Sequence, residues 1–527
     1  MRSWTRTTVK PRACAYAALL LLAIAACSNN DHSSMPASST GSTTAAPARG
    51  KLIQSPVQRV GSYSPSELLA LLAGSALGKT LLQLAYTPMC TIDVYHLEYD
   101  TVDPLGNLTP ASGALMVPSG AASCQGGRPV LLYAHATQTN RAYDISALAA
   151  SGNDEGLLMA AVFAAEGYIV VAPNYVGYDI STLGYHPYLV AQQQSADMID
   201  ALAAGRSALP TADAASTTDG GKLFVTGYSQ GGYVAMATLR AMQAAQMPVT
   251  AAAPMSGPYA LSAYVDAVFE GEVSLSAPEN LIMLAAGYQN IYKNLYSVTT
   301  DVFNPAYATG IGSLLPSDTA VSTLESQGKI PGALFSATPP APAYAAMTPA
   351  TVPQNLAPAF ALGFGPDYLV TNAYRLAYLQ DAAAAPDGGF PGVTDRLPPA
   401  NPKNGLRVDL KTNDLRTFEP TGPVLLCAGS SDPTVFYLNT QLMVDYWTAN
   451  AAAAHLTVLD IDSPVAANDP YASLKNGFVA AKALVIAGAV AGGATDGGVL
   501  QVLEDYHATL VPPFCLSAAK AFFDALT

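Results

Sequence analysis

One segment of the chain, residues 222–232, limits the possible folds more than any other. It joins an apolar run at residues 223–225, typical of a buried strand, to a Gly-x-Ser-x-Gly motif centred on Ser229, and a helix-compatible run follows. A serine on a sharp strand-to-helix turn projects its hydroxyl above the sheet, and flanking glycines permit the turn without Cβ clashes. The motif alone is weak evidence, but this context indicates that Ser229 is a nucleophile.

The same turn predicts half of a site for a negatively charged intermediate. The helix expected after Ser229 directs free N–H groups at it, and the N–H of Gln230 is the first of these. A second donor is expected just after the apolar strand at residues 128–134, where Ala136 and Thr137 follow His135. Either backbone N–H could serve, and we expect His135 itself to shape the turn rather than act as a base.

A serine hydroxyl needs a base near neutral pH, and histidine is the usual one. The other histidines fit this role less well, because of their positions in a tether, in the first hairpin, before the serine or at a strand start: His32, His96, His135, His186 and His455. His507 remains, and we expect it in a loop between the last strand and the last helix. Its alternative is a surface loop histidine.

The base needs a carboxylate partner, and Asp432 directly follows the predicted strand at residues 422–429. Asp432 could instead cap a helix that has Pro433 at its first position, and both roles are compatible. Weaker candidates are Asp460, Asp462 and Asp505. The chain order Ser229, Asp432, His507 is the order that the strand-turn-helix serine topology requires.

Several short motifs resemble a known family. They are Tyr133-Ala134-His135-Ala136-Thr137, Asn174-Tyr175-Val176-Gly177-Tyr178, His186-Pro187-Tyr188-Leu189, Gly227-Tyr228-Ser229-Gln230-Gly231-Gly232 and Ser431-Asp432-Pro433-Thr434-Val435. Together they are similar to capped secretory lipases and related bacterial lipoprotein esterases of the α/β-hydrolase superfamily, over roughly residues 60–527. The resemblance implies a triad of Ser229, Asp432 and His507 beneath a cap that covers an acyl pocket.

The chain departs from that family pattern at two places. The oxyanion turn has His135-Ala136 where the family has His-Gly, which leaves the second donor open. The long gap between Asp432 and His507 indicates an insertion around residues 470–498.

Alternating strand and helix patterns predict an α/β fold, with a mostly parallel central sheet and helices on both faces. The pattern stops at about residue 258, so we expect a large, mainly helical cap inserted before the penultimate core strand. The predicted divisions are a signal peptide with lipobox (1–27), a flexible tether (28–55), the first part of the core (56–257), the cap (258–419) and the second part of the core (420–527).

The N-terminus has the pattern of an export signal. Basic residues precede an apolar run at residues 15–26 that is short for a membrane span, and Ile24-Ala25-Ala26-Cys27 resembles a lipobox. We expect lipidation of Cys27 and an outer-membrane or periplasmic lipoprotein; the alternative is an ordinary signal peptide and a secreted protein. No other stretch is expected to span a bilayer, since the closest one, residues 481–493, is too short.

Four cysteines lie beyond the signal in an oxidising compartment, and four cysteines allow three pairings. We expect Cys90–Cys124, which would tie the first hairpin together, and Cys427–Cys515, which would tie the strand before Asp432 to the segment after His507. No Cys-x-x-Cys motif or histidine cluster is present, so no metal is expected.

Composition narrows the function further. With 50% hydrophobic and 12% charged residues the chain is globular, and its formal net charge of −14 makes nucleic acid a poor partner. We expect a monomeric serine ester hydrolase that needs no cofactor, contacts membrane only through its anchor and acts on a small or lipid-like ester. Alternatives are a serine peptidase and an inactive surface binding protein.

Aromatic residues in the predicted cap favour an ester with an apolar acyl or alkyl part. They include Tyr288, Tyr292, Phe303, Phe360 and Phe364. An equally plausible interpretation is that these side chains form the core of the cap itself.

Overall fold

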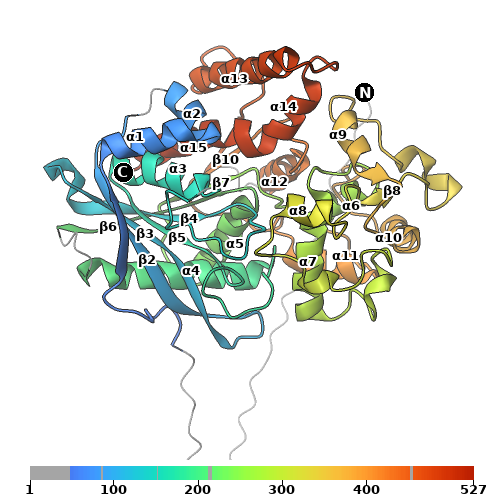
Figure 1. Ribbon diagram of the computed structural model, residues 1–527, viewed down its shortest axis with the longest axis horizontal. Coiled ribbons are helices and arrows are strands. Elements are labelled where there is room, and N and C mark those ends of the chain that lie inside the picture. The colour runs from blue at the N-terminus through green and yellow to red at the C-terminus, as the bar shows by residue number, and fades with distance from the viewer. Residues whose placement is uncertain (1–47, 85–86, 151, 212–215, 451–454) are drawn as a thin grey trace, which may run out of the picture. The chain divides into compact units, whose positions relative to one another are not determined.

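The computed structural model describes residues 48–84, 87–150, 152–211, 216–450 and 455–527 (Figure 1). The predicted signal peptide, the lipobox at Cys27 and most of the predicted tether lie outside the described residues. All described residues belong to one compact unit that spans residues 47–527.

The core is a nine-stranded sheet in the order β1-β2-β3-β5-β4-β6-β7-β10-β11 among the described residues. Strands β1 to β3 pair antiparallel and β3 pairs antiparallel with β5, whereas the remaining pairs are parallel. The bounds are β1 (Gln58–Tyr63), β2 (Thr91–Val102), β3 (Leu108–Ser119), β4 (Gly126–Ala134), β5 (Ile169–Pro173), β6 (Thr217–Tyr228), β7 (Ala251–Met255), β10 (Val424–Ala428) and β11 (Leu456–Asp460). Every residue of β5, β7 and β10 is buried, which explains their uninterrupted apolar sequences.

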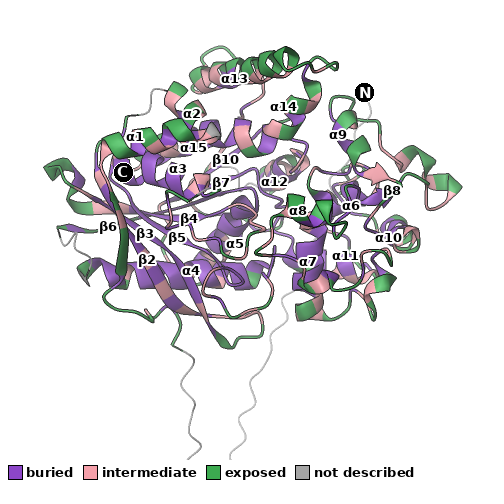
Figure 2. Cartoon of the chain, in the orientation of Figure 1, coloured by how far each residue is buried: buried purple, intermediate pink, exposed green. Residues whose placement is uncertain are grey.

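Helices cover both faces of the sheet, as the alternating pattern predicts (Figures 1 and 2). Helices α4 and α5 pack together on one face, and α3 and α15 contact each other on the other face. The bounds of the core helices are α1 (Pro65–Gly74), α2 (Ala76–Gln83), α3 (Asp154–Val162), α4 (Ala191–Ala208), α5 (Gln230–Ala244), α12 (Leu438–Ala449), α13 (Ala472–Ala491), α14 (Val499–Asp505) and α15 (Val511–Asp524). The predicted fold class is confirmed.

A helical region is inserted between β7 and β10, before the penultimate strand, as expected. It comprises α6 (Leu261–Phe269), α7 (Ala277–Tyr292), α8 (Val321–Ser326), α9 (Ala357–Leu362), α10 (Asn372–Ala384), α11 (Gly405–Asn413) and a small sheet of β8 (Phe335–Ser336) and β9 (Phe364–Gly365). Buried arginines tie it together: Arg407 pairs with Asp266 at 2.7 Å, and Arg416 pairs with Asp387 at 2.6 Å. Such buried pairs fix the relative positions of the elements that carry them.

The tether ends earlier than predicted. The Gly50 N–H donates to the Asp100 carbonyl at 2.7 Å, Leu52 forms a β-bridge with Tyr99, and Arg49 pairs with Asp200 at 3.0 Å. The boundary at residue 55 is therefore wrong, because residues 49–53 are hydrogen-bonded to β2 and α4.

The predicted insertion at residues 470–498 is mainly helix α13. It has 20 residues, and an 18-residue window within it has a mean hydropathy of 1.5. By length and composition alone this helix could cross a membrane, so the expectation that the stretch is too short is wrong. The helix begins nine residues before Ala481, and its two lysines do not cancel the apolar majority.

Candidate active site

Ser229 lies on a sharp turn between β6 and α5. Its backbone has φ 59° and ψ −123°, a conformation that non-glycine residues seldom adopt. A Cβ on Gly227 would lie 2.2 Å from the Gly231 carbonyl oxygen, and one on Gly231 would lie 1.9 Å from the Ala134 carbonyl oxygen. Only glycine fits these two positions, which explains the motif spacing around Ser229.

The three side chains predicted to form a triad meet at this turn. His507 Nε2 lies 2.8 Å from Ser229 Oγ, and His507 Nδ1 lies 2.6 Å from Asp432 Oδ2. The other Asp432 oxygen accepts the N–H groups of Thr434 at 2.9 Å and Val435 at 3.0 Å. One carboxylate thus orients the imidazole and caps a tight turn at the same time.

His507 does not lie in a loop, which corrects the sequence prediction. It lies in a π-helical turn, Tyr506–Leu510, between α14 and α15. Such widened turns occur often at functional sites because they re-aim a side chain within a continuous helix. The Tyr228 hydroxyl donates to the His507 carbonyl at 2.6 Å and fixes this turn above the sheet.

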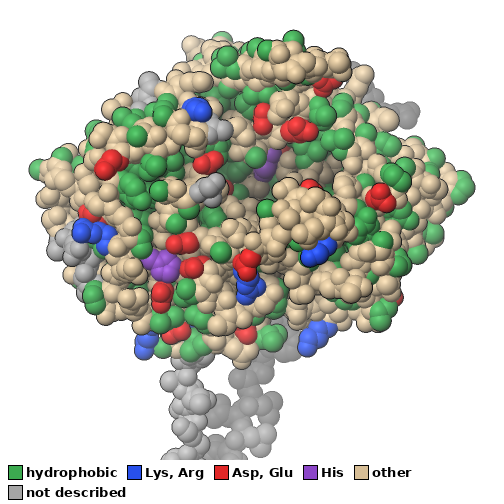
Figure 3. All heavy atoms as spheres, viewed as in Figure 1, with side chains coloured by type: hydrophobic (Ala, Val, Ile, Leu, Met, Phe, Trp, Pro, Cys, Tyr) green, Lys and Arg blue, Asp and Glu red, His purple; other side chains and the backbone are tan. Residues whose placement is uncertain are grey.

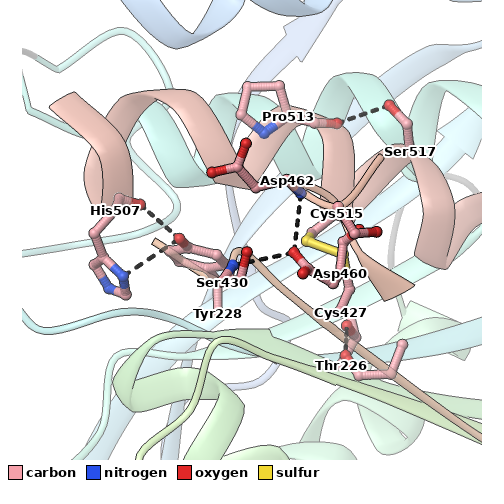
Figure 4. The surroundings of a disulfide bond; sticks show 12 residues. Thr226, Tyr228, Cys427, Ser430, Asp460, Asp462, His507, Pro513, Cys515 and Ser517 are labelled. Carbon is pink, nitrogen blue, oxygen red and sulfur yellow. Dashed lines mark hydrogen bonds between the residues drawn. A yellow bond between two sulfur atoms is a disulfide. The ribbon is translucent and has the colours of Figure 1, made fainter. Parts of the chain in front are cut away.

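Two of the weaker carboxylate candidates, Asp460 and Asp462, make supporting contacts instead of contacting His507, and the third, Asp505, accepts the Gln501 side-chain amide at 3.1 Å. Asp460 accepts the N–H groups of Ser430 and Asp462, each at 3.0 Å (Figure 4). Asp462 accepts the Tyr506 hydroxyl at 2.7 Å, next to His507 in sequence. These contacts connect the end of β11 and the residues just after it to the loop that carries Asp432 and to the π-helical turn that carries His507.

The two predicted oxyanion donors in the turn after β4 differ. The Ala136 N–H donates to the Glu155 carboxylate, with distances of 2.9 and 3.2 Å to its two oxygens. Ala136 is therefore the wrong choice, because its N–H already has an acceptor. Among the described residues no partner is found for the Thr137 N–H, and the Thr137 side-chain oxygen lies 2.8 Å from the Tyr188 hydroxyl. Gln230 begins helix α5, and its N–H together with that of Thr137 stays the predicted pair.

Glu155 was not expected in the site. It lies in the first turn of α3, lines the same cavity as Ser229 and also accepts the Tyr133 hydroxyl at 3.2 Å. Burial raises the pKa of Glu155 to about 7, although the Ala136 N–H and the Tyr133 hydroxyl favour the charged form. In the sequence it is one of two acidic residues at a helix start, where acidic side chains are common without any chemical role.

His135 and His186 are buried behind the oxyanion turn. The His135 ring stacks on Tyr175 with centroids 4.1 Å apart, and burial lowers the pKa of His135 to about 4. The Gln230 side-chain nitrogen lies 2.7 Å from His186 Nε2, and burial lowers the pKa of His186 to about 3. Both rings are thus neutral near pH 7 and shape the site, as expected for His135.

A cavity of about 720 Å³ opens beside Ser229 and His507, between the core and the inserted helices. Aliphatic side chains make up much of its wall, among them Leu158, Leu189, Leu261, Val265, Leu281 and Leu284. Its charged lining among the described residues is acidic: Asp154, Glu155, Glu279, Glu325 and Glu504. Figure 3 shows a hollow in this face with acidic side chains around it.

The aromatic residues expected to line an acyl pocket do not reach this cavity. Tyr288, Phe303 and Phe360 are buried in the hydrophobic core, and Tyr292 and Phe364 pack against it. The alternative interpretation, that they form the core of the inserted region, is correct. The apolar wall comes from leucine and valine side chains and from other aromatic residues, including Tyr264 and Phe269 of α6.

Both predicted disulfides are present. Cys90–Cys124 joins the start of β2 to the segment before β4, and Cys427–Cys515 joins β10 to α15. Figure 4 shows the second bond close to Asp460 and Tyr228. This bond ties the strand that precedes Asp432 to the helix that follows His507.

Among the described residues, one group of side chains outside the cavity could hold a metal ion. His96, Asp144 and Asp179 offer ligand atoms that all lie within 4.8 Å of one another. His96 Nε2 already contacts Asp179 at 2.8 Å, and the Ser112 hydroxyl donates to the same carboxylate at 2.6 Å. None of the three lines the cavity with Ser229, so a role there does not follow.

Comparisons with known proteins agree with this fold. Residues 157–267 match the model of the prolyl oligopeptidase family. A ligand-bound structure of the rice cell wall degrading esterase LipA from Xanthomonas oryzae is 23% identical, with a TM-score of 0.65, and the match covers 91% of this chain and 100% of that one. A provisionally named hydrolase from Legionella pneumophila is 20% identical, with a TM-score of 0.61, over 90% of this chain and 98% of that one. No curated protein matches the chain.

Proposed function

We propose that this chain, a hydrolase with the α/β-hydrolase fold, cleaves carboxylic esters through an acyl-enzyme on Ser229. The observation that carries the proposal is the continuous hydrogen-bonded path from Ser229 Oγ through the His507 ring to Asp432, with distances of 2.8 and 2.6 Å. Ser229 and His507 line a cavity that has an apolar wall. Serine, base and orienting carboxylate in this geometry suit acyl transfer.

The reaction proceeds in two steps. His507 Nε2 takes the proton of Ser229 as its oxygen attacks the ester carbonyl, and Asp432 stabilises the imidazolium that forms. The negatively charged oxygen of the intermediate accepts hydrogen bonds from the N–H groups of Gln230 and Thr137. His507 then protonates the leaving alcohol, and water attacks the acyl-enzyme by the same route to release the acid.

The cavity suggests which esters fit. Its aliphatic wall suits an apolar acyl or alkyl part, and no lysine or arginine lines it among the described residues. An ester that also carries a free carboxylate would meet acidic side chains and, in the described part of the lining, no lysine or arginine, and would be disfavoured. Uncharged esters with an apolar part are therefore the proposed substrates.

A serine peptidase is the second candidate, since residues 157–267 match a family named after an oligopeptidase. The triad chemistry is the same for both substrate classes, so the geometry of Ser229 and His507 does not separate them. The aliphatic cavity wall favours the ester, because a peptide requires hydrogen-bonding partners along its backbone.

The proposal includes export of the chain from the cytoplasm. Both disulfides would persist in an oxidising compartment, and the lipobox at Cys27 would anchor the mature chain to a membrane. Mass spectrometry of the N-terminal peptide from the native host tests this, since a diacylglyceryl group on Cys27 is expected.

The test of function compares nitrophenyl esters graded by acyl length with peptide anilides on the purified chain. We expect ester turnover that Ser229→Ala reduces by about 10⁵-fold or more, with an unchanged melting temperature. Faster turnover of the anilides would favour the peptidase. Equal turnover in the Ser229→Ala variant would reject both.

A further inference from the structure

Helix α13 presents an apolar surface to solvent that no other element of the described chain covers. Only 17% of its most apolar 18-residue window is buried. Its large aliphatic side chains Val479, Leu484, Ile486 and Val490 are 58, 61, 41 and 50% exposed. In Figure 2 the helix is largely green, the colour of exposed residues. Soluble proteins seldom expose a continuous apolar patch unless it meets another surface.

The two lysines of α13 pair with acidic residues of the protein, whereas its other polar residues, Ser473 and Asn476, are exposed near its start. Lys475 pairs with Asp469 at 2.6 Å, and Lys482 pairs with Asp462. Phe478 packs edge-on against Tyr506. From residue 479 to residue 491 every exposed residue is Ala, Gly, Val, Leu or Ile. The surface over α13, at the top of Figure 3, is accordingly green and tan.

A helix on a folded domain usually has an apolar side that faces the core and a polar side that faces solvent. In α13 the inner side is apolar, with Phe478 and Ala481 in the core, and the exposed side is apolar as well. This arrangement fits a helix that lies in a lipid surface, where the apolar side is buried in lipid. The net charge of the chain indicates whether this lipid surface is anionic or uncharged. Because its formal net charge is −14 and α13 offers no unpaired cation, an anionic surface would repel the protein.

The position of α13 links this surface to the active site. The chain runs from α13 through α14 into the turn that carries His507, and Glu504 of α14 lines the cavity. The ring of Tyr506, the neighbour of His507, lies against Phe478 on the inner side of α13. A lipid surface in contact with the exposed side of α13 would thus lie near the segment that carries His507.

We propose that α13 is a docking helix that enters the surface of an uncharged lipid phase and brings the cavity to esters held there. This inference rests on the proposed function for the identity of the substrate, but the docking itself does not require catalysis. The partner is a zwitterionic or neutral lipid surface, not an anionic one.

The experiment measures co-sedimentation with phosphatidylcholine vesicles. The chain used begins at residue 28, which keeps every described residue and removes any lipid on Cys27. Leu484→Ser with Ile486→Ser should reduce vesicle binding about tenfold or more. The matched control is Leu105→Ser, 67% exposed in the connection between β2 and β3, and it should bind as the parent does. All variants should hydrolyse a short soluble ester at the parent rate.

Three results would overturn the inference. They are no vesicle binding by the parent chain, equal binding by the double variant, and a dimer in light scattering that the double variant dissociates, which would assign α13 to a second copy. Stronger binding to phosphatidylglycerol vesicles would contradict the choice of an uncharged surface. Vesicle binding by a chain that turns over no ester would instead refute the proposed function alone, and the Ser229→Ala variant should bind vesicles as the parent does.

Discussion

The N–H of Ala136 donates to the carboxylate of Glu155 at 2.9 Å, across the turn expected to hold the oxyanion. This contact distinguishes the two N–H groups of the turn. The Ala136 N–H is bound to the first turn of α3, whereas the Thr137 N–H can donate to a ligand. Glu155 thereby anchors the turn at Ala136, the residue that follows His135.

Removing the charge of Glu155 should change how stability depends on pH. Burial raises the pKa of Glu155 to about 7 in the folded chain from an ordinary value of 4.5. The folded state therefore holds its proton more tightly, and stability is lost as the pH rises from about 4.5 to about 7. Glu155→Gln keeps an acceptor for Ala136 and avoids that loss. The melting temperature of the variant minus that of the parent should grow across this window and stay level above it; a difference constant with pH would contradict the assignment.

Asp432→Asn should lower kcat by about 10⁴-fold, because an amide favours the wrong tautomer of His507. The Asp432 oxygen that accepts the N–H groups of Thr434 and Val435 has a counterpart in asparagine, so the fold should survive. Asp505→Asn is the matched control, next to His507 in sequence, and kcat should stay within about twofold. Equal losses in both variants would show that the carboxylate contact at 2.6 Å does not orient the base.

The disulfide Cys427–Cys515 should support activity as well as stability. Replacing both cysteines by alanine should cost about 2–5 kcal/mol of unfolding free energy and lower kcat, because the bond ties the strand before Asp432 to the helix after His507. The same replacement at Cys90–Cys124 should lower stability without lowering kcat at a temperature where the chain stays folded. Identical effects on kcat would mean that neither bond positions the triad.

The stability of the inserted region should depend on Arg416. Its guanidinium pairs with Asp387 at 2.6 Å and with Asp414 at 2.8 Å, and all three side chains are fully buried. Arg416→Met would leave two buried carboxylates unpaired and should cost about 3–5 kcal/mol in denaturant unfolding. Arg206→Met breaks a half-exposed pair with Asp219 and should cost at most about 1 kcal/mol. A similar small loss at Arg416 would show that the buried network contributes no more than a surface pair.

Local sequence patterns were sufficient to predict the core of the fold and the triad. The apolar run before Ser229 becomes β6, and the glycines at 227 and 231 stand where a Cβ would collide with backbone oxygens. Asp432 was then selected because it directly follows a predicted strand, and His507 because the other histidines fit the role of base less well. Each of these features is encoded within a few residues, which is why the sequence reveals it.

Features that depend on distant contacts were missed. Glu155 meets Ala136 only because α3 returns beneath the turn after β4, and the acidic start of α3 has an ordinary local explanation. The five cap aromatics named from the sequence lie in or against the core instead of the cavity wall for the same reason, since side-chain direction in an irregular insertion depends on its partners. The turn of His507 is π-helical because α14 continues into α15, which no local pattern announced.

Labelling with a fluorophosphonate probe tests the central claim most directly, because the probe reacts with a serine only when a base activates it. Peptide mapping of the labelled full chain should find one adduct, on Ser229. The adduct should be absent in Ser229→Ala and form at least about a hundredfold more slowly in His507→Ala. An adduct on another residue, or labelling of Ser229 that does not depend on His507, would contradict the account.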